Sequence, residues 1–124
     1  MGDTPAEGQH LVNSAKGFYA RLGRVGAAAT LPSADEAARE LTDAQKEEPT
    51  TIVDGRWPRF IAGGPNDVRD TLEQMLKESG ADELMIQDLI ANPADRQHSQ
   101  ALLAQAFALS PHHPSPAAEP AASR

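Results

Sequence analysis

The chain has 124 residues, a net charge of −7 and no cysteine. It is too short for a complete (β/α)8 barrel, which needs about 250 residues, and the absence of cysteine excludes disulfides and thiolate metal sites. Its acidic character argues against nucleic acid and anionic membranes as partners. Leucine, isoleucine, valine and phenylalanine supply only 22 of the 124 residues, so any hydrophobic core must be thin.

Targeting signals are also missing from the sequence. No apolar run follows the first residues as in a signal peptide, and no stretch approaches the ~18 consecutive apolar residues of a membrane span. These features predict a cytoplasmic protein that binds neither nucleic acid nor a membrane.

Short helices are predicted for the N-terminal half, after a flexible polar segment at residues 1–8. Apolar residues repeat with helical spacing over 9–22. Two capping boxes follow, Ser33–Glu36 and Thr42–Gln45, and they predict helices at 34–41 and 43–48.

The C-terminal half alternates between extended and helical patterns. The residues Phe60, Ile61 and Ala62 favour at most a short strand, and Gly63-Gly64-Pro65 then opens a predicted helix over 65–79. A strand is predicted at about 84–87, followed by a helix over 93–109. Residues 110–124, rich in proline and alanine, are predicted to be a disordered tail.

The strand at Leu84-Met85-Ile86 is the most informative of these elements. It is apolar on successive residues, as is a parallel strand that is buried on both faces. Such a strand needs a hydrogen-bonded neighbour on each side, and the sequence contains at most one other strand. The pattern therefore predicts an incomplete α/β unit, mostly helical, with one or two short parallel-type strands.

Three motifs in this half carry a resemblance to a known family. They are Gly63–Val68, Gly80–Ile86 and Asp95–Ser99, with Leu102, Leu103, Ala104 and Phe107 after the last. They resemble the C-terminal end of the bacterial luciferase-like flavin-dependent monooxygenases, where Gly-Thr-Pro, Gly-Ala-Asp-Glu-Leu-Met and Asp-Arg-x-x-Ser are common. Gly64 stands where the family usually has threonine. The stretch Leu31–Ala37 is similar to the one that precedes this region.

The resemblance implies a fold and a chemistry for the whole family. Members form a (β/α)8 TIM barrel that binds FMN or the deazaflavin F420, and they join reduced flavin, molecular oxygen and an organic substrate. By this resemblance residues 9–109 are an incomplete barrel fragment that holds the last strand and its flanking helices. The earlier strands, which carry most flavin contacts and the catalytic groups, lie outside the chain, so no catalytic residue is assigned.

Three groups of residues are candidates for a binding site, each with a simpler structural alternative. Gly63-Gly64-Pro65 leads into a helix N-terminus that can hold a phosphate, or it is only a tight turn. Gln87 and Asp88 follow the predicted strand and can face a flavin or a substrate, or they only lead out of the strand. Arg96 and Ser99 match the family motif, and Arg96 either binds phosphate or pairs with Asp95, Asp88 or a helix end.

The histidines and the tryptophan give weaker signals. His10, His98, His112 and His113 do not form a metal-binding pattern. A triad of Ser99, His98 and Asp95 fails on geometry, because adjacent helical side chains point apart. Trp57 is either an anchor for a partner or a packing residue beneath its loop.

The sequence thus leaves more than one function open. The first hypothesis is the C-terminal portion of a luciferase-like flavin-dependent monooxygenase, inactive alone, whose missing barrel comes from a longer product, a partner chain or a homo-oligomer. The second is a small helical interaction module without catalysis, and the third is a truncated remnant.

Overall fold

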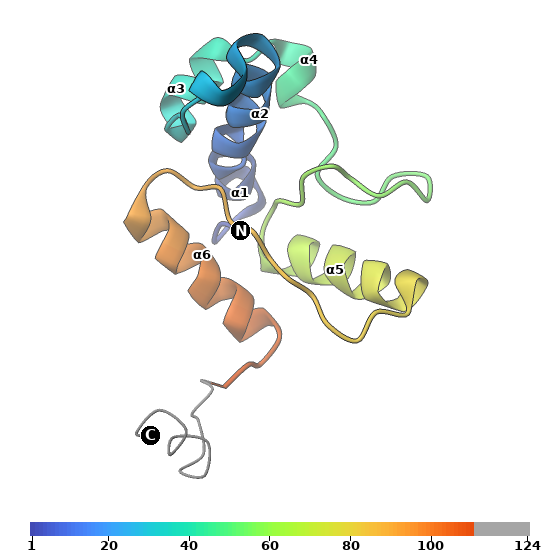
Figure 1. The fold of residues 1–124 in the computed structure, drawn as a ribbon. Coiled ribbons are helices and arrows are strands. Elements are labelled where there is room, and N and C mark those ends of the chain that lie inside the picture. Colours follow the sequence, from blue (N-terminus) through green and yellow to red (C-terminus); the bar gives the residue numbers. More distant parts are fainter. Residues whose placement is uncertain (111–124) are drawn as a thin grey trace, which may run out of the picture.

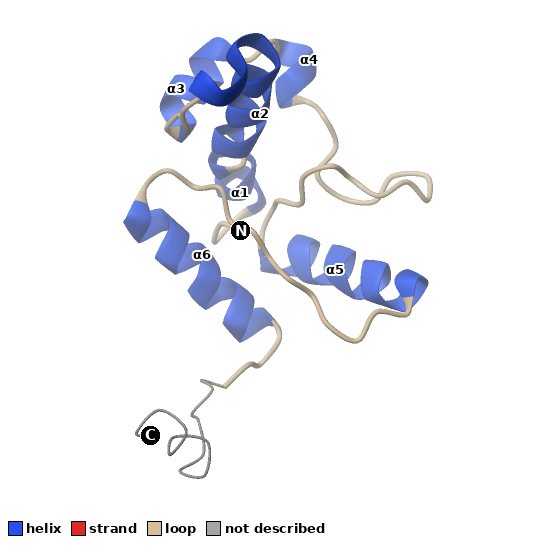
Figure 2. Ribbon diagram, in the orientation of Figure 1, coloured by secondary structure: helices blue, strands red, loops and turns tan. Residues whose placement is uncertain are grey.

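The computed structural model describes residues 1–110, and every regular element among them is helical (Figure 1; Figure 2). The elements in chain order are α1 (Pro5–Leu11), α2 (Asn13–Val25), the 3-10 turn η1 (Gly26–Ala28), α3 (Ala34–Glu40), α4 (Asp43–Lys46), α5 (Pro65–Ser79) and α6 (Pro93–Ala106). None of these helices is both long and apolar enough to cross a bilayer. The predicted disordered tail lies, from residue 111 onward, outside the described residues.

The predicted fold class, an α/β TIM-barrel fragment with parallel strands, is wrong for this chain. Residues 84–87 and 60–62, the two predicted strands, lie outside helix and strand alike. Within residues 1–110 the only β pairing is one antiparallel bridge between Val53 and Arg56. A strand exists only through hydrogen bonds to a neighbouring strand. Within residues 1–110 these two segments have a single backbone hydrogen bond to another segment, from the Ala62 amide to the Thr50 carbonyl oxygen at 3.1 Å, and one bond does not make a strand pair.

The N-terminal helices begin earlier and end later than predicted. Thr4 caps α1 by accepting a hydrogen bond from the Glu7 amide at 3.2 Å, so residues 1–8 include the first helical turn. The predicted helix over 9–22 consists of the end of α1 and most of α2, which meet at Val12. Helix α2 continues to Gly26, whose φ of 60° ends it.

The other helix boundaries follow the predicted caps closely. Ser33 accepts from the Glu36 amide at 3.1 Å, and Thr42 and Gln45 form both bonds of a capping box. The predicted helices 34–41 and 43–48 end slightly earlier, at Glu40 and Lys46. Helix α5 has both predicted ends, whereas α6 stops at residue 106 instead of 109.

The helices form two groups. In the N-terminal group α2 packs on α3 and also contacts α1 and α4, and in the second group α5 packs on α6. Figure 1 shows the first group at the top and the second below it, with the uncoiled segment 80–92 running between α5 and α6. Met1, Val68 and Leu72 form the buried centre of the second group. Around them pack partly buried side chains, namely Ile61, Leu102, Leu103, Ala106 and Phe107.

The two groups meet where α1 passes the Gly63 turn. A Cβ atom on Gly8 would lie 2.2 Å from the Gly63 carbonyl oxygen, so only glycine allows this approach. The Gly2 amide donates to the same carbonyl at 3.0 Å. The start of the chain is thereby held against the turn that begins α5.

Alanine at position 8 should therefore weaken the fold. We expect Gly8→Ala to lower the free energy of unfolding by about 1–3 kcal/mol, because the added methyl group overlaps backbone that cannot move freely. Urea denaturation measures the change. Gly23→Ala is the matched control: it lies on an exposed part of α2 with open space around its Cβ position, and it should stabilise by about 0.5–1 kcal/mol. Equal effects of the two substitutions would contradict the packing described here.

A buried lysine joins α2 to the end of α4. The Lys16 side chain is only 4% exposed, and its Nζ donates to the carbonyl oxygens of Lys46 at 2.7 Å and Glu48 at 3.0 Å. Burial lowers the pKa of this ammonium group, and the Glu48 carboxylate opposes that shift. Lys16 thus satisfies carbonyls that the short helix leaves without internal partners.

Removing that ammonium group should cost stability. We expect Lys16→Met to lower the free energy of unfolding by about 2 kcal/mol, because two carbonyls lose their donor while the apolar packing is kept. Thermal unfolding followed by circular dichroism gives the change. Lys77→Met, on the exposed face of α5, is the control and should stay within about 0.5 kcal/mol of wild type. A variant at position 16 as stable as this control would show that the two bonds contribute nothing.

Candidate functional site

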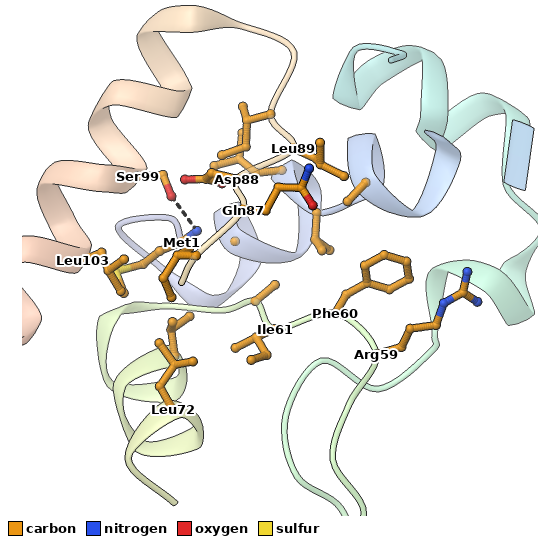
Figure 3. Close-up of a pocket in the computed structure, with 18 of the residues that line it drawn as sticks. Met1, Arg59, Phe60, Ile61, Leu72, Gln87, Asp88, Leu89, Ser99 and Leu103 are labelled. Carbon is orange, nitrogen blue, oxygen red and sulfur yellow. Dashed lines mark hydrogen bonds between the residues drawn. The ribbon is translucent and has the colours of Figure 1, made fainter. Parts of the chain in front are cut away.

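An apolar groove lies between the two helical groups of the described residues. Its volume is about 470 Å³. Helices α1, α2, α5 and α6 contribute residues such as Leu11, Ala15, Leu72 and Leu103, and Met1 and the uncoiled segments 59–62 and 84–90 supply the remaining walls. Figure 3 shows the labelled side chains of these segments gathered around one space.

One end of the groove is polar. The Met1 amino group donates to Ser99 Oγ at 3.0 Å, and Ser99 is only 3% exposed (Figure 3). Burial lowers the pKa of this amino group from its ordinary value of 8.0, and the carboxylates of Asp88 and Glu7 partly offset the shift. This end therefore holds a buried donor and an acceptor beside a negative charge.

The other end carries a cation among aromatic rings. The Arg59 guanidinium lies 5.5 Å from the ring centre of Tyr19 and 5.1 Å from that of Phe60. The two rings are themselves 5.6 Å apart. Contacts of this kind attract a cation by the ring quadrupole. Arg59 makes no ion pair with the described residues, so its charge remains available to an anion.

The wall formed by residues 84–86 exposes apolar side chains. Leu84 is 39%, Met85 98% and Ile86 45% exposed. The sequence predicted these residues to be buried on both faces, and the structure instead leaves them at the open side of the groove. Exposed apolar side chains adjoining a groove are typical of a surface that another molecule covers.

The predicted phosphate site at Gly63-Gly64-Pro65 is not suited to an anion. The Asp67 carboxylate accepts the Gly64 amide hydrogen at 3.0 Å, so the helix N-terminus already has an acceptor. A second anion there would meet the charge of Asp67 at close range. Gly63-Gly64-Pro65 is therefore a tight turn, which is the simpler of the two alternatives that the sequence offered. It also offers no cradle for the phosphate of FMN or F420, the cofactors that the family resemblance implies, so the residues of this turn do not fit a flavin phosphate.

The other predicted site residues are only partly brought together. Gln87, Asp88 and Ser99 all line the groove. Arg96 does not reach it: its Nη1 donates to the carbonyl oxygen of Ile90 at 3.1 Å and so holds the segment that leads into α6. None of the acidic partners weighed from the sequence contacts its guanidinium within the described residues.

His10, His98 and Trp57 lie outside the groove. His10 pairs with Asp35 and His98 with Asp3, both at 2.9 Å, so each ties two segments of the fold together. His112 and His113 fall outside the described residues. Trp57 is 46% exposed and donates from Nε1 to Glu78 at 3.3 Å. Among residues 1–110 no three histidine, aspartate or glutamate side chains gather as a metal site would require.

Sequence reasoning missed Arg59, Tyr19 and the Met1 amino group. Tyr19 belongs to the apolar repeat that predicts a helix over 9–22, and Arg59 belongs to none of the motifs singled out in the sequence. The run Arg59-Phe60 gave a signal for a cation beside an aromatic ring, but its second ring comes from a helix 40 positions earlier in the chain. That contact becomes visible only in three dimensions.

Comparison with known proteins finds similarity to a solved structure. No family model matches the chain, and no curated protein matches it. The solved structure of apo-MsnO8 matches with a TM-score of 0.72 and 34% sequence identity. The match covers 90% of this chain but 33% of the MsnO8 chain, so this chain spans about a third of that protein's length.

The Ser99 hydroxyl should stabilise the fold in a pH-dependent way. Because the pKa of the Met1 amino group is lower in the folded state, the unfolded chain binds more protons, and stability should rise as pH rises from the folded pKa towards 8.0. Ser99→Ala should cost about 1–3 kcal/mol at about pH 6, where the charged amine needs its acceptor, and less at about pH 9.

Urea denaturation at both pH values measures this difference. Ser110→Ala, at an exposed position, is the control and should change stability by less than about 0.5 kcal/mol at either pH. A loss in Ser99→Ala that is the same at both pH values would contradict the role given to the amino group.

Proposed function

We propose that this chain is the C-terminal portion of a luciferase-like flavin-dependent monooxygenase and is inactive on its own. One observation carries the proposal: the chain matches a third of the much longer MsnO8 chain over 90% of its own residues, while its apolar groove stays open. A groove that opens on exposed Leu84, Met85 and Ile86 is what removal of covering polypeptide leaves behind.

The roles of the motif residues support the same proposal. Asp67 caps the turn, Arg96 holds a loop, and Ser99 binds a buried amine. These are structural tasks, and none of them sets a nucleophile beside a base or a donor beside a reacting oxygen. We therefore assign the catalytic groups and the flavin contacts to polypeptide beyond this chain.

In such an enzyme the flavin, FMN or F420, supplies the redox chemistry when bound. This chain contributes the apolar groove beside the polypeptide that holds the flavin. The apolar walls exclude water, which strengthens the interactions of any charge held there. Arg59 provides a positive charge at one end, and Asp88 a negative one near the other. The partner in this proposal is the remainder of the enzyme, and a second copy of the chain is the alternative. The absence of cysteine supports a cytoplasmic location.

A non-catalytic interaction module is the second candidate. Capped helices and a core of its own favour it, because both are complete without further polypeptide. On this view the groove receives a protein ligand and flavin chemistry is not involved.

Flavin binding separates the two candidates. We expect no binding when the purified chain is titrated with FMN or with F420 and followed by flavin fluorescence. The chain co-expressed with the uncovered two thirds of the MsnO8 chain as a separate polypeptide, which leaves the Met1 amino group free, should bind flavin, with the intact MsnO8 chain as the reference. Tight binding by this chain alone would contradict the proposal. A complex without flavin beside a reference with flavin would favour the interaction module.

A further inference from the structure

The segment Asp82–Leu89 makes no backbone hydrogen bonds. Within the part of the chain that the structure describes, none of its amides or carbonyls is bonded to another protein group. The residues on either side differ, because the Ala81 amide donates to Ser79 Oγ and the Ile90 carbonyl accepts from Arg96. The segment is therefore held at its two ends and free between them.

The side chains at the centre of this segment are open to solvent. Met85 is almost fully exposed, and Leu84 and Ile86 are close to half exposed. Figure 1 shows the segment as an uncoiled stretch between α5 and α6. An endoprotease binds its substrate as an extended chain, with hydrogen bonds to the backbone and pockets for single side chains. This segment offers both without any prior unfolding.

The other exposed aliphatic side chains lie on bonded backbone. Among the described residues three further large aliphatic side chains are exposed, namely Val25, Val53 and Leu109. The first is the last residue of helix α2. The Val53 amide donates to the Arg56 carbonyl oxygen at 3.2 Å, and the Leu109 amide donates to the Ala104 carbonyl oxygen at 2.8 Å. A protease can bind the backbone at these places only after the bonds have opened.

We propose that Leu84–Ile86 is a proteolytic cleavage site, cut by an endoprotease whose S1′ pocket, which takes the residue after the cut, is aliphatic. Water adds across one of the three peptide bonds that precede these residues. Its hydroxyl group goes to the carbonyl carbon, and its remaining hydrogen goes to the amide nitrogen. The site depends on the geometry of this chain and goes beyond the proposed function, because it is present under either candidate function.

Charge narrows the class of protease. The carboxylates of Asp82, Glu83 and Asp88 flank the apolar centre of the segment. Complementary charge favours association, and like charge opposes it. A protease whose outer subsites are basic therefore fits this site better than one whose outer subsites are acidic.

A cut at this site breaks the covalent link between the two helices of the second group. Helices α5 and α6 pack on each other, and the core around Val68 and Leu72 includes side chains of both. Without the link, more entropy is lost when the two helices are held together. The cut therefore favours unfolding, and Leu84–Ile86 is the point at which turnover of the chain begins.

Limited proteolysis with thermolysin tests the site, because this enzyme cuts on the amino side of large aliphatic residues. We expect the first cut, located by mass spectrometry of the fragments, within Leu84–Ile86 and at least about tenfold faster than before Val53 or Leu109. A free peptide of residues 80–92 is the reference. The cutting rate of the folded chain should lie within about tenfold of the peptide's, and dilute urea should not change the ratio, because nothing in the fold has to open.

Serine substitutions test which side chains the protease recognises. The combined variant Leu84→Ser, Met85→Ser and Ile86→Ser should be cut by thermolysin at this segment at least about tenfold more slowly, because the S1′ pocket loses its ligand. Subtilisin, which has a broad side-chain preference, should still cut the variant there first, because the backbone remains free. Val53→Ser, at another exposed aliphatic position, is the matched control and should leave the cutting unchanged.

Three results would overturn the proposal. The first is an initial thermolysin cut at Val53, at Leu109 or within a helix. The second is cutting at Leu84–Ile86 that is slower than in the free peptide by more than about tenfold and accelerates with urea in step with global unfolding. The third is a combined serine variant that thermolysin cuts at this segment as fast as the wild-type chain.

Discussion

The rest of the structure depends on the contact between the first residues of the chain and the Gly63 turn. Gly8 approaches the Gly63 carbonyl more closely than any side chain allows, and the Gly2 amide binds the same oxygen. Met1 then enters the core beside Val68 and Leu72, and its amino group reaches Ser99. Since α2 and α3 form one packed group and α5 and α6 another, this short segment joins two halves that otherwise share little surface. The groove is the space left where they diverge.

The helices could be predicted because their signals are local. A hydroxyl at Ser33 or Thr42 and a glycine at Gly80 act within a few residues, and the structure places caps at each of them. The strand predicted at 84–87 is absent from the structure, because a strand does not depend on local signals alone. Its apolar pattern predicts burial between neighbouring strands that this sequence does not contain. A strand forms only through hydrogen bonds to such a neighbour.

The residues of the candidate site could likewise be predicted only where their signals are local. Gln87, Asp88 and Ser99 were found because they follow or match short motifs, and they do line the groove. A phosphate at Gly63-Gly64-Pro65, one of two alternatives there, is disfavoured by Asp67, a residue inside the same motif whose carboxylate accepts the Gly64 amide hydrogen. Arg59 went unnoticed because its partner ring, Tyr19, is brought near only by folding. Whether a residue can bind a ligand thus depends on the hydrogen bonds that it already makes within the fold. A short sequence motif does not show these bonds.

The all-helical fold of residues 1–110 is compatible with the match to MsnO8. Similarity at a TM-score of 0.72 concerns the path of the chain, and that path is kept here by caps, the Gly8 contact and the small core around Val68. Strand character concerns hydrogen bonds between segments, and those bonds need both partners. A chain can therefore follow the path of a larger protein while the segment Asp82–Leu89 remains uncoiled, without strand structure and exposed.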